Sequence, residues 1–446
     1  MAKLERVKYI VIGNSVGGIG AAEAIREVDK AGAVTIVSAE PYPAYSRPLI
    51  SEYLVSKCPL EKMLLRPPDF YERNHLQLIL GQRVTGLDID KHVAKLEHGK
   101  TIGWERLLLA TGSLPIIPRI EGIDQGGVFT FSTLDEAKAI EQYLSQRVSR
   151  AVVVGGGLIG ISVTEALVKR GLKVAIVEAK ERVLSTILDE EASALAEEKL
   201  KQAGVEIITG HTLASVRSYH LSGGVTGVTL DDSSPIPCEL VVVAIGVQPR
   251  TELVAGTAIK IDRGVVVDRH MATSVAGVYA CGDVAEAYDF VYGENRLTPI
   301  WPNAHIGGRV AGFNMAGVPT KYPGGTAMNS FKYFGLAIVS AGMVNPPDSS
   351  YEVLTKRHNH NYKKVVLKNG LVVGLVFAGE IEKSGIIFNL MKERVKVEGF
   401  KQALVAEDFG LAFLPEELWR PHLEVPLSLA PSVAPSGQPE EIIVGE

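Results

Sequence analysis

Tyr9–Ile25 reads YIVIGNSVGGIGAAEAI and Ala151–Leu167 reads AVVVGGGLIGISVTEAL, and these two stretches decide the fold of the chain. Each reads as a short apolar strand, a glycine-rich turn and the start of a helix. A turn without bulky side chains lets the backbone approach a pyrophosphate, and the helix N-terminus adds free N–H groups and a positive dipole. One such turn is a weak signal. Two in one chain predict two dinucleotides, held so that electrons pass between them.

The bulk composition describes an ordinary globular protein. The 446 residues are enough for about three domains of roughly 150 residues each. Hydrophobic residues make up 46% of the chain and charged residues 22%. The net charge of −5 provides no basic field for nucleic acid or for an acidic membrane surface. No apolar run approaches the roughly 18 residues that span a bilayer, and the N-terminal apolar stretch is too short for a signal peptide.

The chain contains three cysteines, Cys58, Cys238 and Cys281, and no two of them are close in sequence. This usage fits a reducing cytoplasm, which is the compartment we expect. It excludes a disulfide framework, a CxxC redox pair and a four-cysteine iron–sulfur site within this chain. Any metal cluster must therefore belong to a partner. We predict no metal ligands, and we interpret His358 and His360 (RHNHN) as part of a solvated hairpin turn.

The order of strands and helices predicts an α/β fold of two Rossmann-like three-layer domains with a C-terminal α+β interface domain. The second glycine unit is inserted into the first. The first unit resumes after it, with a predicted strand at Val278–Ala280. From about Thr326, short alternating apolar segments predict an antiparallel sheet followed by helices. The predicted domains are 1–120 with 251–323, then 121–250, then 324–425. A Pro- and Ser-rich tail, 426–446, is expected to be mobile or bound to a partner.

Five motifs in a fixed order resemble those of the pyridine nucleotide–disulfide oxidoreductase superfamily, over residues 1–420 or so. These are the Gly13 turn, the ATG at Ala110–Gly112, the Gly155 turn, the AIGVQPRTEL strand end, and the CGD at Cys281–Asp283. Within the superfamily, YSRPLISEYL at Tyr45–Leu54 and WPNAHIGGRVAG at Trp301–Gly312 are most similar to rubredoxin reductases and to the NADH-binding module of assimilatory nitrite reductases.

The resemblance implies FAD at the first turn. The three small positions of the family turn match Gly13, Ser15 and Gly18, so a serine replaces the middle glycine. Glu40 is expected to hold the FAD ribose, although Ser38 occupies the position where many relatives place that acid. The other residues expected at FAD are Arg47 for the pyrophosphate, Thr111 and Gly112 of the ATG, Asp283 for the ribityl or phosphate portion, and Asn303, whose helix points at the flavin pyrimidine.

The second turn keeps all three small positions, Gly155, Gly157 and Gly160, and the resemblance implies that it binds the nicotinamide cofactor together with Gly246. Glu178 ends the next strand. A carboxylate there accepts hydrogen bonds from a ribose diol and repels a 2′-phosphate, so NADH is favoured over NADPH. Lys180 and Arg182 follow closely and weaken that preference.

Disulfide-reducing relatives keep a redox cysteine on the helix where this chain reads AYSRPLISEYL, and this chain has none there. Cys58 comes about three helical turns too late, and we interpret it as a surface or packing thiol. Near relatives also place a Lys and a Glu beside the flavin, and the matching positions here are Glu52 and Ser162. We therefore assign no catalytic side chain. His305 is interpreted as packed or solvated.

The leading hypothesis is an FAD-dependent enzyme that oxidises NADH and passes electrons to an iron–sulfur or rubredoxin-like protein or to a partner subunit. Nitrite reductase and carbon monoxide dehydrogenase systems are both conceivable. One alternative is a stand-alone NADH oxidase, although its water-forming type needs a cysteine for a sulfenic acid step. The other is a flavoprotein whose NADH-dependent conformation regulates association. A homodimer or hetero-oligomer through the C-terminal domain is possible in each case.

Overall fold

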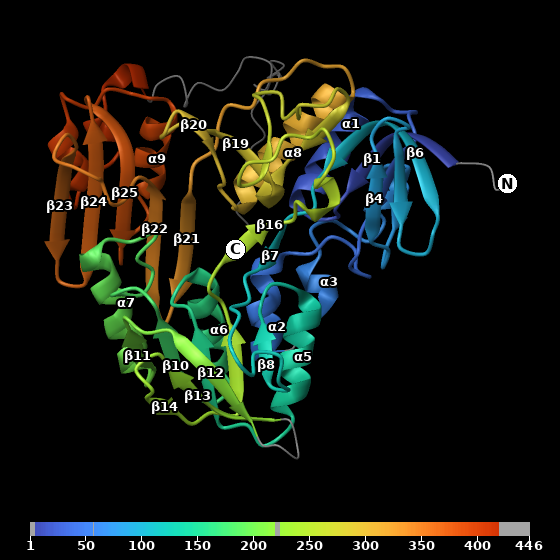
Figure 1. Ribbon diagram of the computed structural model, residues 1–446. Helices are drawn as coiled ribbons and strands as arrows, with labels where there is room; N and C mark the ends of the chain where they lie inside the picture. The colour runs from blue at the N-terminus through green and yellow to red at the C-terminus, as the bar shows by residue number, and fades with distance from the viewer. Residues whose placement is uncertain (1–4, 57, 219–223, 419–446) are drawn as a thin grey trace, which may run out of the picture.

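The structure is a computed structural model that describes residues 5–56, 58–218 and 224–418. Figure 1 shows three groups of strands, one near the N-terminus, one in the middle of the chain and one near its C-terminal end. The predicted fold class is confirmed: two of the groups are Rossmann-like α/β units and the third is built on an antiparallel sheet. The predicted tail, 426–446, lies outside the described residues. None of the helices within the described ranges is long and apolar enough to cross a membrane.

The first unit is a seven-stranded sheet in the order β3-β2-β1-β6-β5-β4, with β18 also paired to β6. Strand β6 pairs with β1 along one side, and along its other side its first residues pair antiparallel with β5 and its last residues pair parallel with β18. The strands are β1 (Glu5–Ile12), β2 (Val34–Val37), β3 (Leu76–Ile79), β4 (Val84–Asp88), β5 (Val93–Leu96), β6 (Thr101–Leu109) and β18 (Val278–Ala280). Its helices are α1 (Val16–Val28), α2 (Ile50–Ser56), α3 (Leu60–Met63), α4 (Phe70–Arg73) and α8 (Trp301–Met315), and a small sheet holds β17 (Val265–Val266), β19 (Ala285–Asp289) and β20 (Glu294–Arg296).

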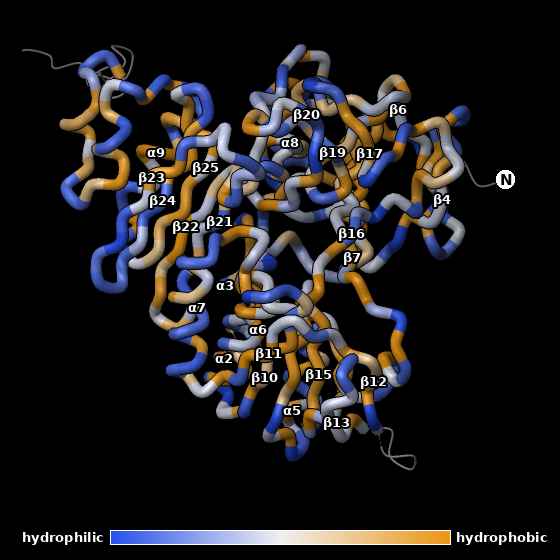
Figure 2. Tube along the Cα trace, turned by 60° about the vertical axis from the view of Figure 1, so that its left-hand side comes forward, coloured by the Kyte–Doolittle hydropathy of each residue, from blue (hydrophilic) through white to orange (hydrophobic). Residues whose placement is uncertain are grey.

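The second unit is a parallel sheet in the order β11-β10-β9-β15-β8. Its strands are β8 (Val128–Thr130), β9 (Arg150–Val154), β10 (Lys173–Glu178), β11 (Glu206–Thr209) and β15 (Leu240–Val243). Its helices are α5 (Leu134–Leu144), α6 (Leu158–Lys169) and α7 (Glu190–Gln202), and an antiparallel sheet beside it holds β12 (Leu213–Ser218), β13 (Val225–Leu230) and β14 (Pro235–Ile236). Its central strands β9 and β15 are apolar apart from Arg150 at the start of β9, as expected for parallel strands covered on both faces, and β15 shows mostly orange in Figure 2.

The chain crosses between the two units twice, and the two crossings pair with each other. Strands β7 (Ser113–Pro115) and β16 (Val247–Pro249) form a two-stranded antiparallel ribbon. The ribbon lies between the two larger sheets in Figure 1. The loops after the ATG and after AIG, which are far apart in the sequence, are thereby brought side by side.

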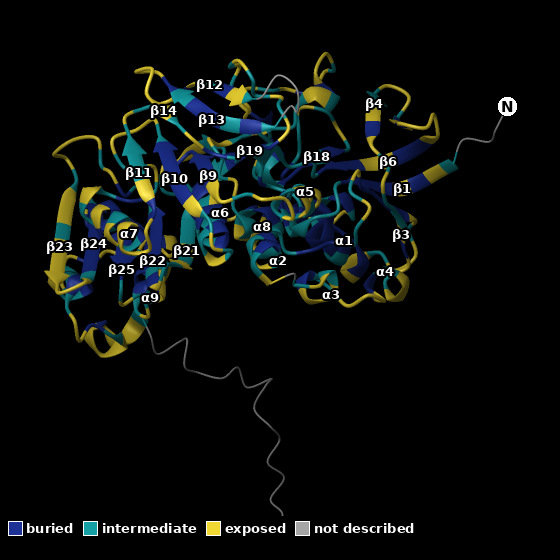
Figure 3. Cartoon of the chain, turned by 90° about the horizontal axis from the view of Figure 1, so that it is seen from below, coloured by how far each residue is buried: buried dark blue, intermediate teal, exposed yellow. Residues whose placement is uncertain are grey.

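The third unit is an antiparallel sheet in the order β21-β22-β25-β24-β23 with α9 (Ser384–Lys392) packed on it. The strands are β21 (Met328–Tyr333), β22 (Leu336–Gly342), β23 (Glu352–His358), β24 (Asn361–Lys368) and β25 (Leu371–Ala378). The inner strands are buried, whereas the edge strand β23 is mostly exposed, as Figure 3 shows. One hydrophobic cluster joins side chains of this sheet, including Ile338 and Val376, to the second unit. The third unit therefore packs directly against the second.

Each glycine turn owes its shape to two glycines. Gly13 and Gly155 have φ angles of 122° and 106°, a backbone conformation that other residues rarely adopt. A Cβ at Gly18 would lie 2.1 Å from the carbonyl oxygen of Gly13, and a Cβ at Gly160 would lie 1.9 Å from that of Gly155. Both helices can approach their turns only because these positions lack a side chain. The two turns thus repeat one geometry, as their sequences predict.

Candidate functional site

The helices that follow the two glycine turns begin without a side-chain cap. Ser15 is the N-cap of α1 and Gly157 that of α6, and neither makes a capping hydrogen bond. By contrast, Thr133 forms a capping box at α5, and the Asp189 carboxylate caps α7. The first N–H groups of α1 and α6 therefore keep their capacity to bind an anion.

Space at the middle position of each turn fits a dinucleotide. A Cβ added at Gly157 would meet nothing within 4 Å, and the same holds at Gly112 of the ATG. A ligand can therefore approach the backbone closely at Gly157 and at Gly112. At the first turn Ser15 adds one hydroxyl at this position, and that hydroxyl does not cap the helix. The residues present fit FAD at the first turn and a nicotinamide dinucleotide at the second.

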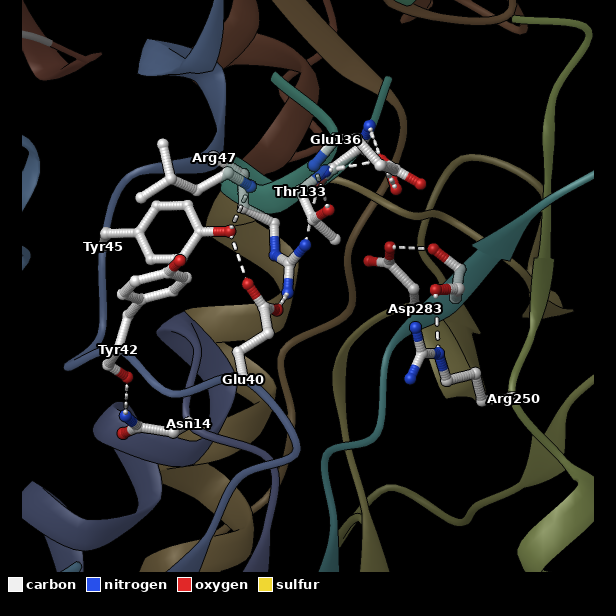
Figure 4. Close-up of polar contacts among 12 residues, drawn as sticks. Asn14, Glu40, Tyr42, Tyr45, Arg47, Thr133, Glu136, Arg250 and Asp283 are labelled. Carbon is white, nitrogen blue, oxygen red and sulfur yellow. Dashed lines mark hydrogen bonds and ion pairs between the residues drawn. The ribbon is translucent and has the colours of Figure 1, made fainter. Parts of the chain in front are cut away.

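Glu40 and Arg47 lie together, but they interact with each other. Arg47 forms an ion pair with Glu40 and donates a hydrogen bond to the Ser132 carbonyl at 2.8 Å. The Tyr45 hydroxyl donates to Glu40 at 2.6 Å and accepts from the Leu134 amide at 2.9 Å. Figure 4 shows this group beside the start of α5. Sequence reasoning missed Tyr45, which joins the loop after β2 to the second unit.

The ATG and CGD motifs also meet. The Ser113 hydroxyl donates to an Asp283 carboxylate oxygen at 2.7 Å. The Thr111 hydroxyl donates to the Arg250 carbonyl at 3.2 Å. Ser113 and Arg250 were not predicted as site residues, although each adjoins a motif that the sequence displays. Asp283 and Glu40 lie on opposite sides of the view in Figure 4.

Helix α8 packs against α1, the helix that follows the first turn. A Cβ at Gly308 would lie 2.0 Å from the Gly17 carbonyl oxygen, so α8 and α1 are in backbone contact. The first residues of α8 have no side-chain cap and include Pro302, which suits the first helical turn. The Asn303 side chain itself donates to the Thr326 carbonyl at 3.2 Å. In this structure Asn303 therefore fixes the start of α8, and the helix N-terminus rather than the amide remains free.

At the second turn, Glu178 accepts a hydrogen bond from the Gly156 amide at 2.6 Å and another from the Lys180 amide at 2.9 Å. The carboxylate is thereby held at the turn where a ribose is expected. Arg182 lies further along, in a hollow that Asp189 and Lys364 also line, and its Nε is buried without a hydrogen-bond partner among the described residues.

Exposed apolar side chains surround the second turn. Ile159 of α6 is 38% exposed and Ile245 is 40% exposed. A Cβ at Gly155 would approach the backbone of Ile245, and Gly246 adopts a φ of 133° with its carbonyl accepting from the Ile116 amide. Apolar walls of this kind suit an aromatic ring and exclude water from it. Gly246 is thus located beside Gly155, where the sequence predicts a nicotinamide-binding residue.

The cysteines are not placed for thiol chemistry. Cys238 and Cys281 are buried, and burial raises the pKa of each thiol to about 12. Cys58 is half-buried and packs beside the cluster that joins the second and third units. A thiolate is the reactive form of cysteine, so neither buried thiol is activated.

Glu52 and Ser162, which match the positions of the relatives' Lys–Glu pair, make other contacts in this chain. Ser162 of α6 lies beside the Tyr333 hydroxyl, whose pKa is raised by burial. Glu52 lines a hollow that Glu165 and Lys332 also line. The interpretation of RHNHN as a solvated turn needs one correction, because the Glu407 carboxylate lies 2.8 Å from exposed His358 and supplies the carboxylate neighbour that the sequence did not indicate.

Two equivalent dinucleotide turns on facing α/β units, with no paired thiols among the described residues, define an oxidoreductase that uses a flavin and a nicotinamide cofactor. The chain belongs to the pyridine nucleotide-disulphide oxidoreductase family, whose sequence pattern matches residues 7–308. Residues 328–395 match the rubredoxin NAD+ reductase C-terminal domain. The predicted family and the branch that resembles rubredoxin reductases are confirmed, and FAD and NADH are the cofactors that this family uses.

Three similar proteins illustrate the relationship. The chain is 32% identical over 424 residues to the NADH-dependent phenylglyoxylate dehydrogenase subunit epsilon of Aromatoleum evansii, covering 94% of this chain and 99% of that one. It is 28% identical over 395 residues to the nitrite reductase [NAD(P)H] of Bacillus subtilis, covering 87% of this chain and 48% of that one, so it spans about half the length of that relative. A crystal structure of a covalent putidaredoxin reductase–putidaredoxin complex matches with a TM-score of 0.83 and 24% identity, covering 94% of this chain and 99% of that one.

Proposed function

We propose that this chain binds FAD at the first turn and NADH at the second, and passes electrons from NADH to an iron–sulfur or rubredoxin-like protein or to a partner subunit. FAD held there would supply the redox chemistry, hydride acceptance from the nicotinamide and electron transfer to the acceptor. The chain's own residues bind both cofactors, orient them and exclude water. The proposed FAD unit comprises residues 1–120 and 251–323, the NADH unit 121–250 and the interface unit 324–425.

The observation that carries the proposal is the combination of two dinucleotide turns with no thiol placed to work between them. The helix that follows Arg47 has no cysteine, and the two buried thiols have raised pKa values. Reduction of a disulfide substrate needs at least one reactive cysteine beside the flavin, so without one we infer that electrons leave the flavin directly for an acceptor. The same absence argues against a water-forming NADH oxidase, whose sulfenic acid step requires a cysteine.

A partner subunit is the acceptor that we favour. The Aromatoleum evansii relative is itself named as a subunit of an NADH-dependent dehydrogenase and matches this chain over almost its full length. The Bacillus subtilis relative is a longer nitrite reductase of which this chain matches about half. A sequence of this kind is therefore one subunit of the first relative's enzyme and one part of a longer polypeptide in the second.

Steady-state rates with NADH and different acceptors test the proposal. Rapid reduction of viologen dyes, rubredoxin or ferredoxin with slow oxygen consumption supports electron transfer to a protein partner. Oxygen consumption as fast as dye reduction establishes the stand-alone oxidase instead. Slow reduction of every acceptor establishes the NADH-sensing flavoprotein. Purification from native lysate, with identification of co-purifying redox proteins, then identifies the partner.

Alkylation of the cysteines is expected to leave NADH-to-dye activity largely intact. In native protein at pH 8, iodoacetamide should modify Cys58 first, because Cys238 and Cys281 are fully buried and their thiols remain protonated. Mass spectrometry locates the modification, and a dye assay on the same sample measures the activity. Loss of flavin reduction with full retention of FAD would show that a thiol takes part after all.

A further inference from the structure

The backbone of Arg250 is tied to the ATG motif. Its amide donates to the Gly112 carbonyl at 3.0 Å, and its carbonyl accepts from the Thr111 hydroxyl at 3.2 Å. Arg250 follows directly after β16, at the point where the chain returns to the first unit. The residue therefore has a fixed place between the two units and beside the predicted FAD site.

The side chain of Arg250 is held beside Asp283. Its Nε donates to the Ser113 carbonyl at 3.2 Å, and the Ser113 hydroxyl donates to Asp283 at 2.7 Å. Figure 4 shows the guanidinium of Arg250 directed toward the side on which Glu40 and Arg47 lie.

The positive charge of the Arg250 guanidinium has no carboxylate partner among the described residues. It forms no ion pair with any carboxylate of the described residues, whereas the nearby Arg47 is paired with Glu40. Burial first, and then repulsion from the guanidiniums of Arg83 and Arg47, lower the pKa of Arg250. Attraction to Glu252 and to Glu40 opposes this effect, but neither carboxylate forms an ion pair with Arg250. Glu40 already accepts hydrogen bonds from Arg47 and Tyr45. A half-buried guanidinium without an ion pair among the described residues is suited to bind an anionic ligand.

We propose that Arg250 binds the phosphate groups of FAD. The inference rests on the proposed function, because it requires FAD at the first turn. The diphosphate of FAD is a dianion, and guanidinium groups bind phosphate through paired, charge-assisted hydrogen bonds. Since Arg250 directly follows the ribbon formed by the two crossings, the same contact also fixes the end of the ribbon when FAD is bound.

Binding of FAD to the apoprotein tests the proposal. Arg250→Gln removes the charge but keeps a side chain able to hydrogen-bond to Ser113. It is expected to raise the Kd for FAD, measured by quenching of flavin fluorescence, about 10- to 100-fold. Arg73→Gln removes an exposed arginine of α4 paired with Asp69 and should leave the Kd unchanged. The Kd for NAD+ should stay the same in both variants, because the second turn is untouched.

Two further measurements separate a charge contact from a structural role. Arg250→Lys should recover part of the lost affinity, and added salt should weaken FAD binding of the parent protein more than that of Arg250→Gln. Equal FAD affinity of parent and Arg250→Gln overturns the assignment of Arg250 and leaves the proposed function intact. Equally weak binding by the Lys and Gln variants, without salt dependence, also overturns it. A parent protein that binds no FAD overturns the proposed function itself.

Discussion

Gly157→Val is expected to abolish NADH binding and to leave the protein yellow with bound FAD. Gly157 has an extended backbone with φ −80° and ψ −176°, which valine adopts readily, and a Cβ there meets nothing within 4 Å. The variant should therefore fold. Its side chain would occupy the space through which a pyrophosphate reaches the N-terminus of α6, so we expect the Kd for NADH to rise at least about 100-fold, or about 2.7 kcal/mol.

Flavin content, from the visible absorbance of the purified protein, and an NADH titration measure the two sites separately. Dithionite should still bleach the flavin of Gly157→Val, whereas NADH should not. Gly385→Val is the matched control, because Gly385 is an exposed helical glycine of the third unit that is also in open space. A Gly157→Val protein that loses FAD but still binds NADH would show that the two turns are assigned in reverse.

Gly160 must not be used in place of Gly157 for this experiment. A Cβ at Gly160 would lie 1.9 Å from the Gly155 carbonyl oxygen, so a side chain there displaces the helix from the turn. Gly160 thus serves the packing of α6, and Gly157 serves access to the ligand. The sequence shows both as glycines of one motif, and only their surroundings separate the two roles.

The parts of the site that could be predicted from sequence are those fixed by local backbone geometry. The Gly13 and Gly155 turns require positive φ angles and a close approach of the following helix. Glycine is the residue that allows both, so the glycines in the sequence predict the two turns directly. The exact end of a helix is harder to predict than its start. Helix α1 ends at Val28, where the Asp29 carboxylate binds Lys8, Tyr9 and the Gly32 amide and turns the chain away from the helix.

Contacts between distant segments could not be predicted. Tyr45 bridges Glu40 to the start of α5, and Arg250 reaches the ATG motif from the other crossing of the chain. Each partner is an ordinary polar residue in the sequence, and only the pairing of β7 with β16 brings the second pair together. A motif therefore locates a cofactor, whereas the side chains that surround it depend on the tertiary fold.

Asp189→Ala is expected to destabilise the attachment of the third unit to the second. The Asp189 carboxylate caps α7 through the Ala192 amide, and it also accepts from the Tyr362 hydroxyl at 2.6 Å and from the Lys364 ammonium at 2.9 Å. The side chain of Lys364 is only 9% exposed. Removing the carboxylate leaves this buried cation without its partner, which typically costs about 3 to 5 kcal/mol. For a chain of 446 residues we therefore expect the Tm to fall by roughly 3 to 5 °C.

Thermal unfolding of the FAD-loaded protein, followed by circular dichroism and by release of flavin fluorescence, measures this loss. Asp90→Ala removes an exposed carboxylate from the turn between β4 and β5 and should leave the Tm unchanged. Adding Lys364→Met to Asp189→Ala should recover much of the loss, because no buried charge then lacks a partner. The hydrogen bond of Tyr362 stays broken in the double variant, so recovery should be incomplete. An unchanged Tm in Asp189→Ala would mean that the hydrophobic cluster of Ile338 and Val376 holds the two units together by itself.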